Sequence, residues 1–476
     1  MKVLSAASEL FPLVKTGGLA DVTGALPAAL AGEGVEVTNI VPGYPAVMAA
    51  LEKASPFHAY GDLFGGPARL MRGTARGLDI IAIDAPHLFD RPGNPYLGTD
   101  GKDWPDNARR FAALAKAAAD VAGGINANYR AGVLHCHDWQ AALGPVYSRF
   151  MGGPKSVMTV HNIAFQGQFP ATVFGILGLP QQAFAIDGVE YYGNVGYLKG
   201  GLAAADAITT VSPTYAQEIC TPEHGMGLDG LLRARRQALR GIVNGIDTDV
   251  WNPAMDGRIP QTYAAGSLTK RAANKRALEK TFRLEPGDGI IHGVVSRLTW
   301  QKGMDIFAAG LDALAAAGAR LALLGTGETA IENAVLEASV RHPGRIGVIT
   351  GHDEDIAHLV QAGADTILVP SRFEPCGLTQ LCGLRYGCVP VVARTGGLND
   401  TVIDANDAAL RAGVATGFQF APVDGAALEH ALARAAECHS DPQLWQGLQR
   451  RGMEQDVSWS RSAAAYARLH RSLVKA

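Results

Sequence analysis

Two cationic side chains lie close together in the second half of the chain, where they could neutralise a phosphorylated ligand. Arg297 and Lys302 follow directly on an apolar run at 290–296, which predicts a strand. Two fixed cations at a strand end suit the negative charge that accumulates on a departing diphosphate in a transition state. Solvated surface charges are the alternative interpretation of the same spacing.

A carboxylate lies in a comparable position after a later strand. Glu374 belongs to a Pro-Cys-Gly turn within 370–379, which follows the apolar run at 366–369 and leads into a predicted helix. Glu374 could accept hydrogen bonds from sugar hydroxyls or balance a developing cation, while the helix start, with the amides of residues 377–379, receives phosphate. Alternatively, Glu374 only stabilises the start of the helix.

The pattern Thr-Gly-Gly-Leu-x-Asp occurs twice, at 16–21 and at 395–400, each time between a predicted strand and a helical stretch. Adjacent glycines allow backbone amides to approach a phosphate or sugar oxygen closely, and the following helix adds its positive end. One copy alone could be an ordinary turn. Two copies in matching contexts favour ligand binding.

Histidines, an aspartate and a tryptophan follow two predicted strands in the first half of the chain. Residues 135–139 are His-Cys-His-Asp-Trp, and residues 161–167 are His-Asn-Ile-Ala-Phe-Gln-Gly. Polar donors beside an aromatic face suit a carbohydrate. We expect His135 and His137, at alternate positions, to point to opposite sides of a strand, which argues against a zinc site formed by the pair. Histidines at strand ends are also common as structural residues, so this pattern alone does not assign catalysis.

Alternating strands and helices must position these side chains. Strands are predicted at 2–6, 35–41, 78–83, 133–135, 156–160 and 207–211, and in a second series at 290–296, 319–324, 345–350, 366–369 and 389–393. Helices are predicted at 21–31, 106–122, 304–317, 329–341, 356–362 and 377–386. The alternation predicts an α/β fold with two Rossmann-like, doubly wound parallel sheets, separated at the turn-rich segment 243–253. Ligands bind such sheets at the carboxyl ends of the strands, so we expect the two domains to face a deep cleft.

Length and composition are consistent with a globular protein of two or three domains. The chain has 476 residues, and 42 Lys and Arg against 45 Asp and Glu leave no global field that would favour nucleic acid or anionic lipid. We find no signal-peptide core at the amino terminus and no convincing membrane span. The six cysteines lack metal-site spacing, which suits reduced thiols in a cytosol.

Several familiar motifs are absent or weak. The chain has no G-x-x-x-x-G-K-[ST] motif, which argues against a P-loop NTPase. A G-x-G-x-x-A sequence begins at Gly325, but Gly347 stands where a ribose-binding acid would be expected, so nicotinamide binding is weakly supported. Two D-x-D sequences, at 247–249 and 353–355, are interpreted as turn and helix-cap chemistry rather than metal ligands.

Together these motifs resemble those of the bacterial glycogen synthases, which are related to plant starch synthases, and the likeness spans essentially the whole chain. Its most specific parts are residues 15–21, 161–167, 243–247, Arg297 with Lys302, 374–380 and 395–398. The resemblance implies the GT-B architecture of two Rossmann-like domains. It places an acceptor-side domain at 1–243, a nucleotide-sugar domain at 244–455, and a helix at 456–476 that crosses back to the first domain.

The activity that the resemblance implies is transfer of glucose from ADP-glucose to the non-reducing 4-hydroxyl of an α-1,4-glucan such as glycogen. The anomeric configuration would be retained, with no metal and no organic cofactor. The expected partners are therefore ADP-glucose and the glucan, not nucleic acid or a membrane, and the expected location is cytoplasmic.

The resemblance also implies roles for individual residues. It assigns catalysis to His161, Glu374, Arg297, Lys302 and Asp138, and in this family the group at His161 is thought to stabilise the glucosyl cation through its backbone carbonyl. Donor binding is assigned to Lys15, Gly17, Gly18, Asp21, Asn162, Asn244, Arg297, Lys302, His352, Cys376, Gly377, Leu378, Thr379, Thr395, Gly396 and Gly397. Acceptor binding is assigned to Tyr96, Asp138 and Trp139.

The sequence departs from related transferases at two positions. Cys382 stands eight residues after Glu374, where many retaining relatives have a second Glu, so Glu374 is expected to act alone. His352 stands where many relatives have a Tyr thought to stack on adenine. Other interpretations are an enzyme of the same fold that uses another nucleotide sugar, a pyridoxal-dependent phosphorylase, a non-catalytic glucan-binding protein and a dinucleotide-dependent oxidoreductase.

Overall fold

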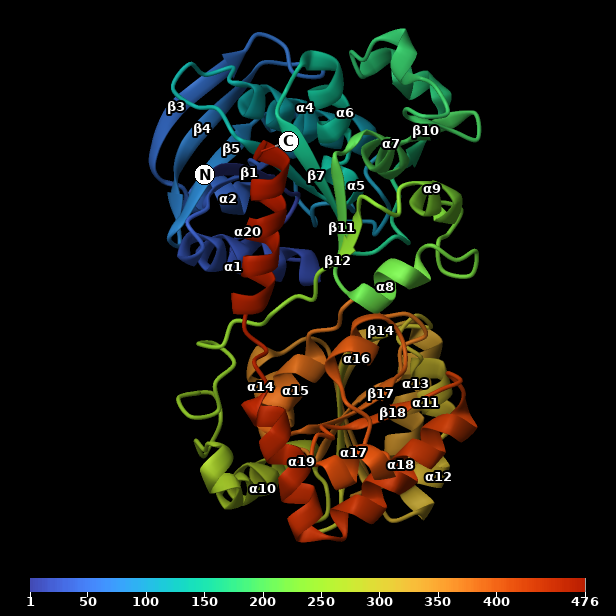
Figure 1. Ribbon diagram of the computed structural model, residues 1–476. Helices are drawn as coiled ribbons and strands as arrows, with labels where there is room; N and C mark the ends of the chain where they lie inside the picture. Colours follow the sequence, from blue (N-terminus) through green and yellow to red (C-terminus); the bar gives the residue numbers. More distant parts are fainter. Residues whose placement is uncertain (476) are drawn as a thin grey trace. The chain divides into compact units, whose positions relative to one another are not determined.

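The computed structural model describes residues 1–475, which divide into two compact units (Figure 1). Unit 1 comprises Met1–Asn244 and the C-terminal segment that begins at Trp459, and unit 2 comprises Gly245–Ser458. Each unit consists of a mainly parallel sheet with helices, so the predicted α/β fold class is confirmed.

Unit 1 is built on a nine-stranded sheet in the order β12-β11-β7-β6-β1-β2-β5-β4-β3. All neighbours pair in parallel except β5 with β4 and β4 with β3, which are antiparallel. The strands are β1 (Lys2–Ala6), β2 (Glu36–Pro42), β3 (Glu52–Tyr60), β4 (Ala68–Ala75), β5 (Leu78–Asp84), β6 (Val133–His137), β7 (Lys155–Val160), β11 (Ala207–Thr210) and β12 (Leu239–Gly241).

The sequence analysis missed the edge hairpin of β3 and β4. Most residues of β3 are exposed, and Pro56 interrupts its sequence. An edge strand needs no continuous apolar run, because it is not covered on both faces, and it tolerates proline. The hydrophobic pattern that identified the central strands is therefore weak here.

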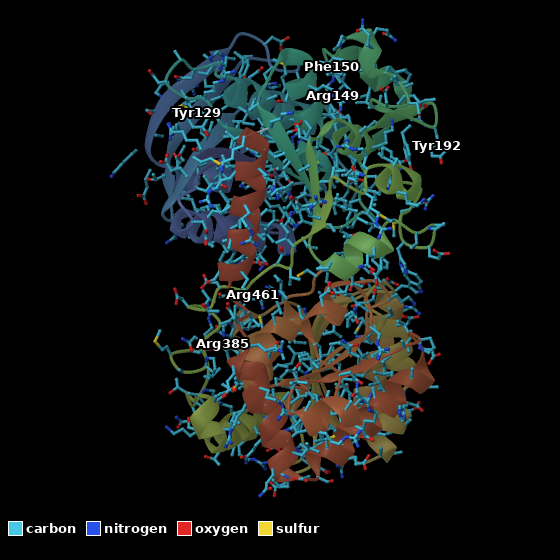
Figure 2. The ribbon with its side chains drawn as sticks, viewed as in Figure 1. Tyr129, Arg149, Phe150, Tyr192, Arg385 and Arg461 are labelled. Carbon is cyan, nitrogen blue, oxygen red and sulfur yellow. The ribbon has the colours of Figure 1, made fainter. Side chains whose placement is uncertain are left out.

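A second, small sheet of unit 1 has the order β8-β10-β9. Its strands are β8 (Gln168–Phe169), β9 (Glu190–Tyr191) and β10 (Asn194–Gly196). Tyr192, in the turn between β9 and β10, is 82% exposed and lies at the edge of the unit (Figure 2).

The helices of unit 1 include the last helix of the chain. They are α1 (Gly18–Gly32), α2 (Pro45–Ala50), α3 (Pro86–Phe89), α4 (Asn107–Gly123), α5 (Asp138–Ala141), α6 (Leu143–Met151), α7 (Tyr197–Ala204), α8 (Pro213–Glu218), α9 (Asp229–Ala234) and α20 (Ser460–Lys475), with 3-10 turns η1 (Ala171–Ile176) and η2 (Gln181–Ala183). Helix α20 packs beside α1 and β6, so the end of the chain contributes to the core of unit 1 (Figure 1). Tyr466 of α20 is fully buried there.

Unit 2 contains a six-stranded sheet in which every pairing is parallel, in the order β15-β14-β13-β16-β17-β18. The strands are β13 (Ile291–Leu298), β14 (Arg320–Gly327), β15 (Ile346–Thr350), β16 (Thr366–Val369), β17 (Val389–Ala393) and β18 (Phe418–Phe420). The helices are η3 (Ala265–Lys270), α10 (Arg271–Phe282), α11 (Met304–Ala309), α12 (Leu311–Ala316), α13 (Thr329–Arg341), α14 (Glu354–Gly363), α15 (Thr379–Tyr386), α16 (Gly396–Thr401), α17 (Asp407–Ala412), α18 (Gly425–His439) and α19 (Pro442–Glu454).

Two predicted helices of unit 2 differ from the structure. The helix expected at 304–317 is two helices, α11 and α12, that meet at Gly310. Glycine is a poor helix former, which explains the break. The helix expected from residue 377 begins at Thr379, because Gly377 adopts a left-handed φ of 72° that does not belong to an α-helix. No described helix is both long and apolar enough to cross a bilayer.

The strand order fixes where a ligand can bind in each unit. In unit 2 the chain goes outward from β13 to β15 on one side and then returns to start the other side with β16, so the order reverses between β13 and β16. In unit 1 it reverses in the same way between β1 and β6. Loops at the carboxyl ends of these strands diverge and leave a crevice, the usual ligand site of open parallel sheets.

Candidate active site

The strand that opens unit 1 leads into a loop organised by a buried carboxylate. Glu9 is 3% exposed, and its Oε2 accepts the amides of Thr16 at 2.6 Å and Gly17 at 3.2 Å. Its Oε1 accepts the Thr16 hydroxyl at 2.5 Å. The Gly17 amide is thus already used, and the first helical amide of α1 belongs to Gly18. Amides in the first turn of a helix have no partner within that helix, so Gly18 is the better anchor for an anion.

Lys15 and Asp21, both expected at the donor, form an ion pair at 2.8 Å. The Lys15 side chain is 39% exposed. An exposed pair of this kind contributes little to stability, so the ammonium can exchange its partner for a ligand oxygen at small cost.

Tyr96, expected near the acceptor, belongs to the same constellation. Its hydroxyl donates to Glu9 Oε1 at 2.5 Å and lies 2.8 Å from Ser8 Oγ. Burial, reinforced by the Glu9 charge, holds the pKa of the Tyr96 phenol well above its usual range. Tyr96 therefore stays protonated and acts as a hydrogen-bond donor.

The strand order of unit 1 reverses between β1 and β6, and we call this reversal the switch point. Asp138 lies on the β6 side of it, directly after that strand. It adopts a left-handed φ of 54°, unusual for a residue other than glycine, and its Oδ1 accepts the backbone amide of His161 at 2.7 Å. Burial raises the pKa of Asp138 to about 7, although the bonds from the His161 and Asn162 amides oppose this. Asp138 thus ties the end of β6 to the loop that follows β7, and Asn162 closes a turn in that loop through Oδ1 and the Ala164 amide at 3.0 Å.

The expectation that His135 and His137 point to opposite sides of a strand is wrong. Their rings stack with centroids 4.2 Å apart, because successive side chains of a strand alternate and residues two apart share a face. The Nδ1 of His137 lies 3.0 Å from the Nε2 of His161. Burial lowers the pKa of His161 to about 3 and that of His137 well below its usual range, so both imidazoles are neutral at physiological pH.

Trp139, the other expected acceptor residue, is half-buried in an aromatic cluster. Its ring packs edge-on against Phe111 at 5.0 Å and lies 5.8 Å from Phe169. No group of three or more His, Cys, Asp or Glu side chains that could hold a metal ion is found within residues 1–475.

In unit 2 the structure brings Lys302 and Glu374 together across the switch point. The Nζ of Lys302 donates to Glu374 Oε2 at 2.5 Å, and Ser371 Oγ donates to the same oxygen at 2.9 Å. Their side chains are 20% and 8% exposed, respectively. Arg297 is exposed at the end of β13 and forms no ion pair with the described residues. The predicted cation pair therefore separates into a paired lysine and an unpaired arginine.

The second Thr-Gly-Gly loop supports the backbone around Glu374. Gly396 has a φ of 44°, and a Cβ there would lie 2.0 Å from the Glu374 carbonyl oxygen. The Gly397 amide donates to the carbonyls of Glu374 at 3.1 Å and Pro375 at 3.2 Å. A Cβ on Gly397 would meet the Cys376 carbonyl oxygen at 2.2 Å. A Cβ on Gly17 of the first loop would meet nothing within 4 Å. The two copies of the pattern thus have different structural roles.

The remaining expected donor residues lie around these loops. Cys376 and Thr395 are buried, Gly377 and Leu378 precede α15, and Thr379 begins it. His352, after the edge strand β15, is 78% exposed, and its Nε2 lies 3.8 Å from Glu354 Oε2. Asn244, the last residue of the first segment of unit 1, is buried, and its Oδ1 has no hydrogen-bond partner among residues 1–475.

The turn and helix-cap roles predicted for the two D-x-D sequences are confirmed. Asp247 Oδ1 accepts the amides of Asp249 and Val250, which closes a turn. Asp353 Oδ1 accepts the amide of Ile356 and caps α14.

Sequence analysis missed two residues that organise the site and one contact within it. Glu9 and Ser371 lie in the loops that follow β1 and β16, so the strand-end rule that selected Glu374 could have found both. His137 was noted, but its ring was expected on the wrong side of the strand, so its contact with His161 was not predicted.

Comparison with known proteins gives a consistent family. Residues 2–234 match the family described as starch synthase catalytic domain, and residues 290–437 match glycosyl transferases group 1. The chain is 57% identical to "Glycogen synthase" of Mesorhizobium japonicum, covering 100% of this chain and 99% of that protein, and equally identical, with the same coverage, to "Glycogen synthase 1" of Rhizobium meliloti.

Solved structures agree with these matches. The catalytic domain of starch synthase IV from Arabidopsis thaliana, bound to ADP and acarbose, aligns with a TM-score of 0.90 at 31% identity, covering 100% of this chain and 99% of that one. Sucrose-phosphate synthase from Thermosynechococcus elongatus aligns at 0.58 with 17% identity, covering 100% and 99%, which shows a common fold alone.

Proposed function

Because this chain belongs to the glycogen synthase family of glycosyltransferases, we propose that it transfers glucose from ADP-glucose to the non-reducing end of an α-1,4-glucan with retention of configuration. The observation that carries the proposal is the contact between Lys302 and Glu374 at the strand-order switch point of unit 2. It joins a phosphate-binding cation to a sugar-binding carboxylate where an open parallel sheet binds its ligand.

Lys302 stabilises the departing diphosphate in this proposal. An ammonium group has three donors, and the bond to Glu374 uses one of them and fixes the direction of the others. The remaining donors and the unpaired guanidinium of Arg297 neutralise the charge that develops on ADP. Lys15 contacts the donor from unit 1, and its exchangeable pair with Asp21 supports this role.

Glu374 holds the glucosyl group. Both protein bonds to its carboxylate reach Oε2, so we assign Oε1 to the sugar hydroxyls. The backbone carbonyl of His161 stabilises the positive charge at the anomeric carbon. This carbonyl shares its peptide group with the Asn162 amide, and the bond of that amide to Asp138 fixes the orientation of the peptide. Asn162 lines the same sugar position, and Tyr96 and Trp139 contact the acceptor glucan.

Exclusion of water favours transfer to the glucan over hydrolysis of the reactive sugar. The acceptor hydroxyl must also be held close to the anomeric carbon, because a bimolecular step is faster when the two reacting groups are fixed in position. We also infer a cytoplasmic location, which is supported by the free thiols of Cys136, Cys220, Cys388 and Cys438.

The test is an assay of the purified chain with ADP-glucose or UDP-glucose as donor and glycogen as acceptor. Release of ADP together with new α-1,4 linkages is the expected result. Glycogen binding without release of ADP would instead identify a non-catalytic glucan-binding protein, and turnover of UDP-glucose alone would contradict the assignment of the donor. Products with the β configuration would contradict retention.

A further inference from the structure

Three buried histidines and the half-buried His161 form a row in unit 1 that ends at the proposed sugar site. They are His470 of α20, His135 and His137 of β6, and His161 after β7. Their neighbouring ring centroids are 5.3, 4.2 and 5.3 Å apart in that order. The proposed mechanism uses only the backbone of His161, so the imidazoles of the row have no role in it.

Within this row, a hydrogen bond joins His137 to His161, the member that lies at the proposed sugar site. The Nδ1 of His137 and the Nε2 of His161 are 3.0 Å apart. Both rings are neutral, so the contact is an N–H···N hydrogen bond with one proton between the two nitrogens. In either direction of that bond, the Nε2 of His161 is occupied and only Nδ1 remains to meet a ligand.

His137 is itself held firmly. Its ring stacks on His135, whose Nε2 lies 2.6 Å from Thr159 Oγ1 on β7. Thr159 Oγ1 lies 2.5 Å from Thr209 Oγ1 on β11. These contacts join three neighbouring strands, so the His137 ring has the rigidity of the sheet interior.

His161, in contrast, lies in the loop beyond β7 and depends on side chains for its orientation. Its backbone amide is bound by Asp138, and its ring is bound by His137. Because residues 137 and 138 are consecutive, one strand end fixes His161 at two points. Fixing both the peptide and the ring leaves little freedom for the residue.

We propose that His137 is a positioning residue that sets the ring orientation and the tautomer of His161 through the Nδ1 to Nε2 hydrogen bond. The expected effect on turnover rests on the proposed function, whereas the tautomer of His161 does not. Loss of His137 should therefore lower kcat more than it changes KM, because the misplaced loop no longer holds the carbonyl of His161 at the anomeric carbon.

The test compares two substitutions of similar size in the full-length protein. His137→Leu removes the hydrogen bond, whereas His137→Asn keeps a polar atom where Nδ1 lies. His292→Leu is the matched control, since His292 is equally buried but bonds to Thr366 Oγ1 at 2.7 Å in unit 2. The readouts are thermal melting, kcat and KM for ADP-glucose, and the nitrogen chemical shifts of ¹⁵N-labelled histidine rings, assigned with a His161 variant.

We expect His161 to show one fixed tautomer in the wild type and in His137→Asn, and averaged tautomers in His137→Leu. We expect kcat to fall about 10-fold in His137→Leu, as for a lost hydrogen bond, and to stay within about 3-fold in His137→Asn and His292→Leu. A fixed, unchanged His161 tautomer in folded His137→Leu would overturn the proposal. Equal losses of kcat in the Leu and Asn variants, both folded, would overturn it too. If the wild type fails to use ADP-glucose, the proposed function fails and the tautomer readout still decides this inference.

Discussion

Removal of the Lys302 ammonium should affect stability and turnover by separable amounts. Lys302→Met leaves Glu374 in place, with the Ser371 hydroxyl as its one remaining side-chain partner among residues 1–475. At 2.5 Å and an effective dielectric constant of about 20, the attraction between the two charges is about 6–7 kcal/mol. Desolvation of both groups offsets most of this, and the lysine side chain is 20% exposed. We therefore expect a loss of about 2–3 kcal/mol in the free energy of unfolding of unit 2.

For a unit of roughly 200 residues, that loss lowers the melting temperature of the unit by about 5–10 °C. Turnover should fall about 10²- to 10³-fold, because a donor to the developing diphosphate charge is gone. Adding Glu374→Gln removes the unpaired charge, so the double variant should regain most of the stability but none of the turnover.

Lys275→Met is the matched control. Lys275 forms a buried pair with Asp365 at 2.8 Å in the same unit, but Asp365 precedes β16 and so lies at the amino edge of the sheet. This variant should lose stability to a similar degree while keeping kcat within about 3-fold. Calorimetry and release of ADP from ADP-glucose measure the two effects. Near-normal turnover in Lys302→Met, or recovery of turnover in the double variant, would refute the assignment of Lys302 to the leaving group.

Three further outcomes follow from the same contacts. Gly397→Ala should destabilise unit 2 by about 3 kcal/mol or more and impair turnover, because its Cβ would meet the Cys376 carbonyl at 2.2 Å. Gly17→Ala has open space around an extended backbone and should change stability by less than about 1 kcal/mol. Equal melting temperatures of the two variants would contradict this distinction. Glu9→Gln should lower stability by about 1.5–3 kcal/mol and raise the KM for ADP-glucose, because the Thr16–Gly17 loop loses its hydrogen bonds to a charged carboxylate. An unchanged KM would argue against contact of that loop with ADP-glucose. His470→Leu should stabilise the protein by about 1 kcal/mol at pH 7, because both buried ring nitrogens lack a partner among residues 1–475. Burial lowers the pKa of His470 to about 4. Between about pH 6.5 and pH 4 the unfolded chain therefore binds a proton at His470 that the folded chain does not, which destabilises the folded wild type as the pH falls. Denaturation curves should show a larger gain in stability from His470→Leu at pH 5 than at pH 7.

The sequence by itself determined the two parallel sheets and the loops that matter. Buried central strands such as β1 and β16 have near-continuous apolar runs because both faces of a parallel sheet are covered, and this pattern is local. The rule that ligands bind at strand ends then selects Lys302, Glu374, Asp138 and His161 without knowledge of any contact. The edge strand β3 has no such signal, because most of its residues are exposed and need not be apolar.

Only the tertiary structure decided which of these residues touch and what the glycines do. The two Thr-Gly-Gly loops have the same local sequence, yet Gly396 packs against the backbone of Glu374, more than 20 residues away in the chain, whereas Gly17, at the same position of the pattern, has free space. Glu9 meets Tyr96, and His137 meets His161, across distances along the chain that no local pattern encodes. The physical reason is that a local pattern fixes which face or end of an element a residue occupies. The packing of elements against one another fixes its partner.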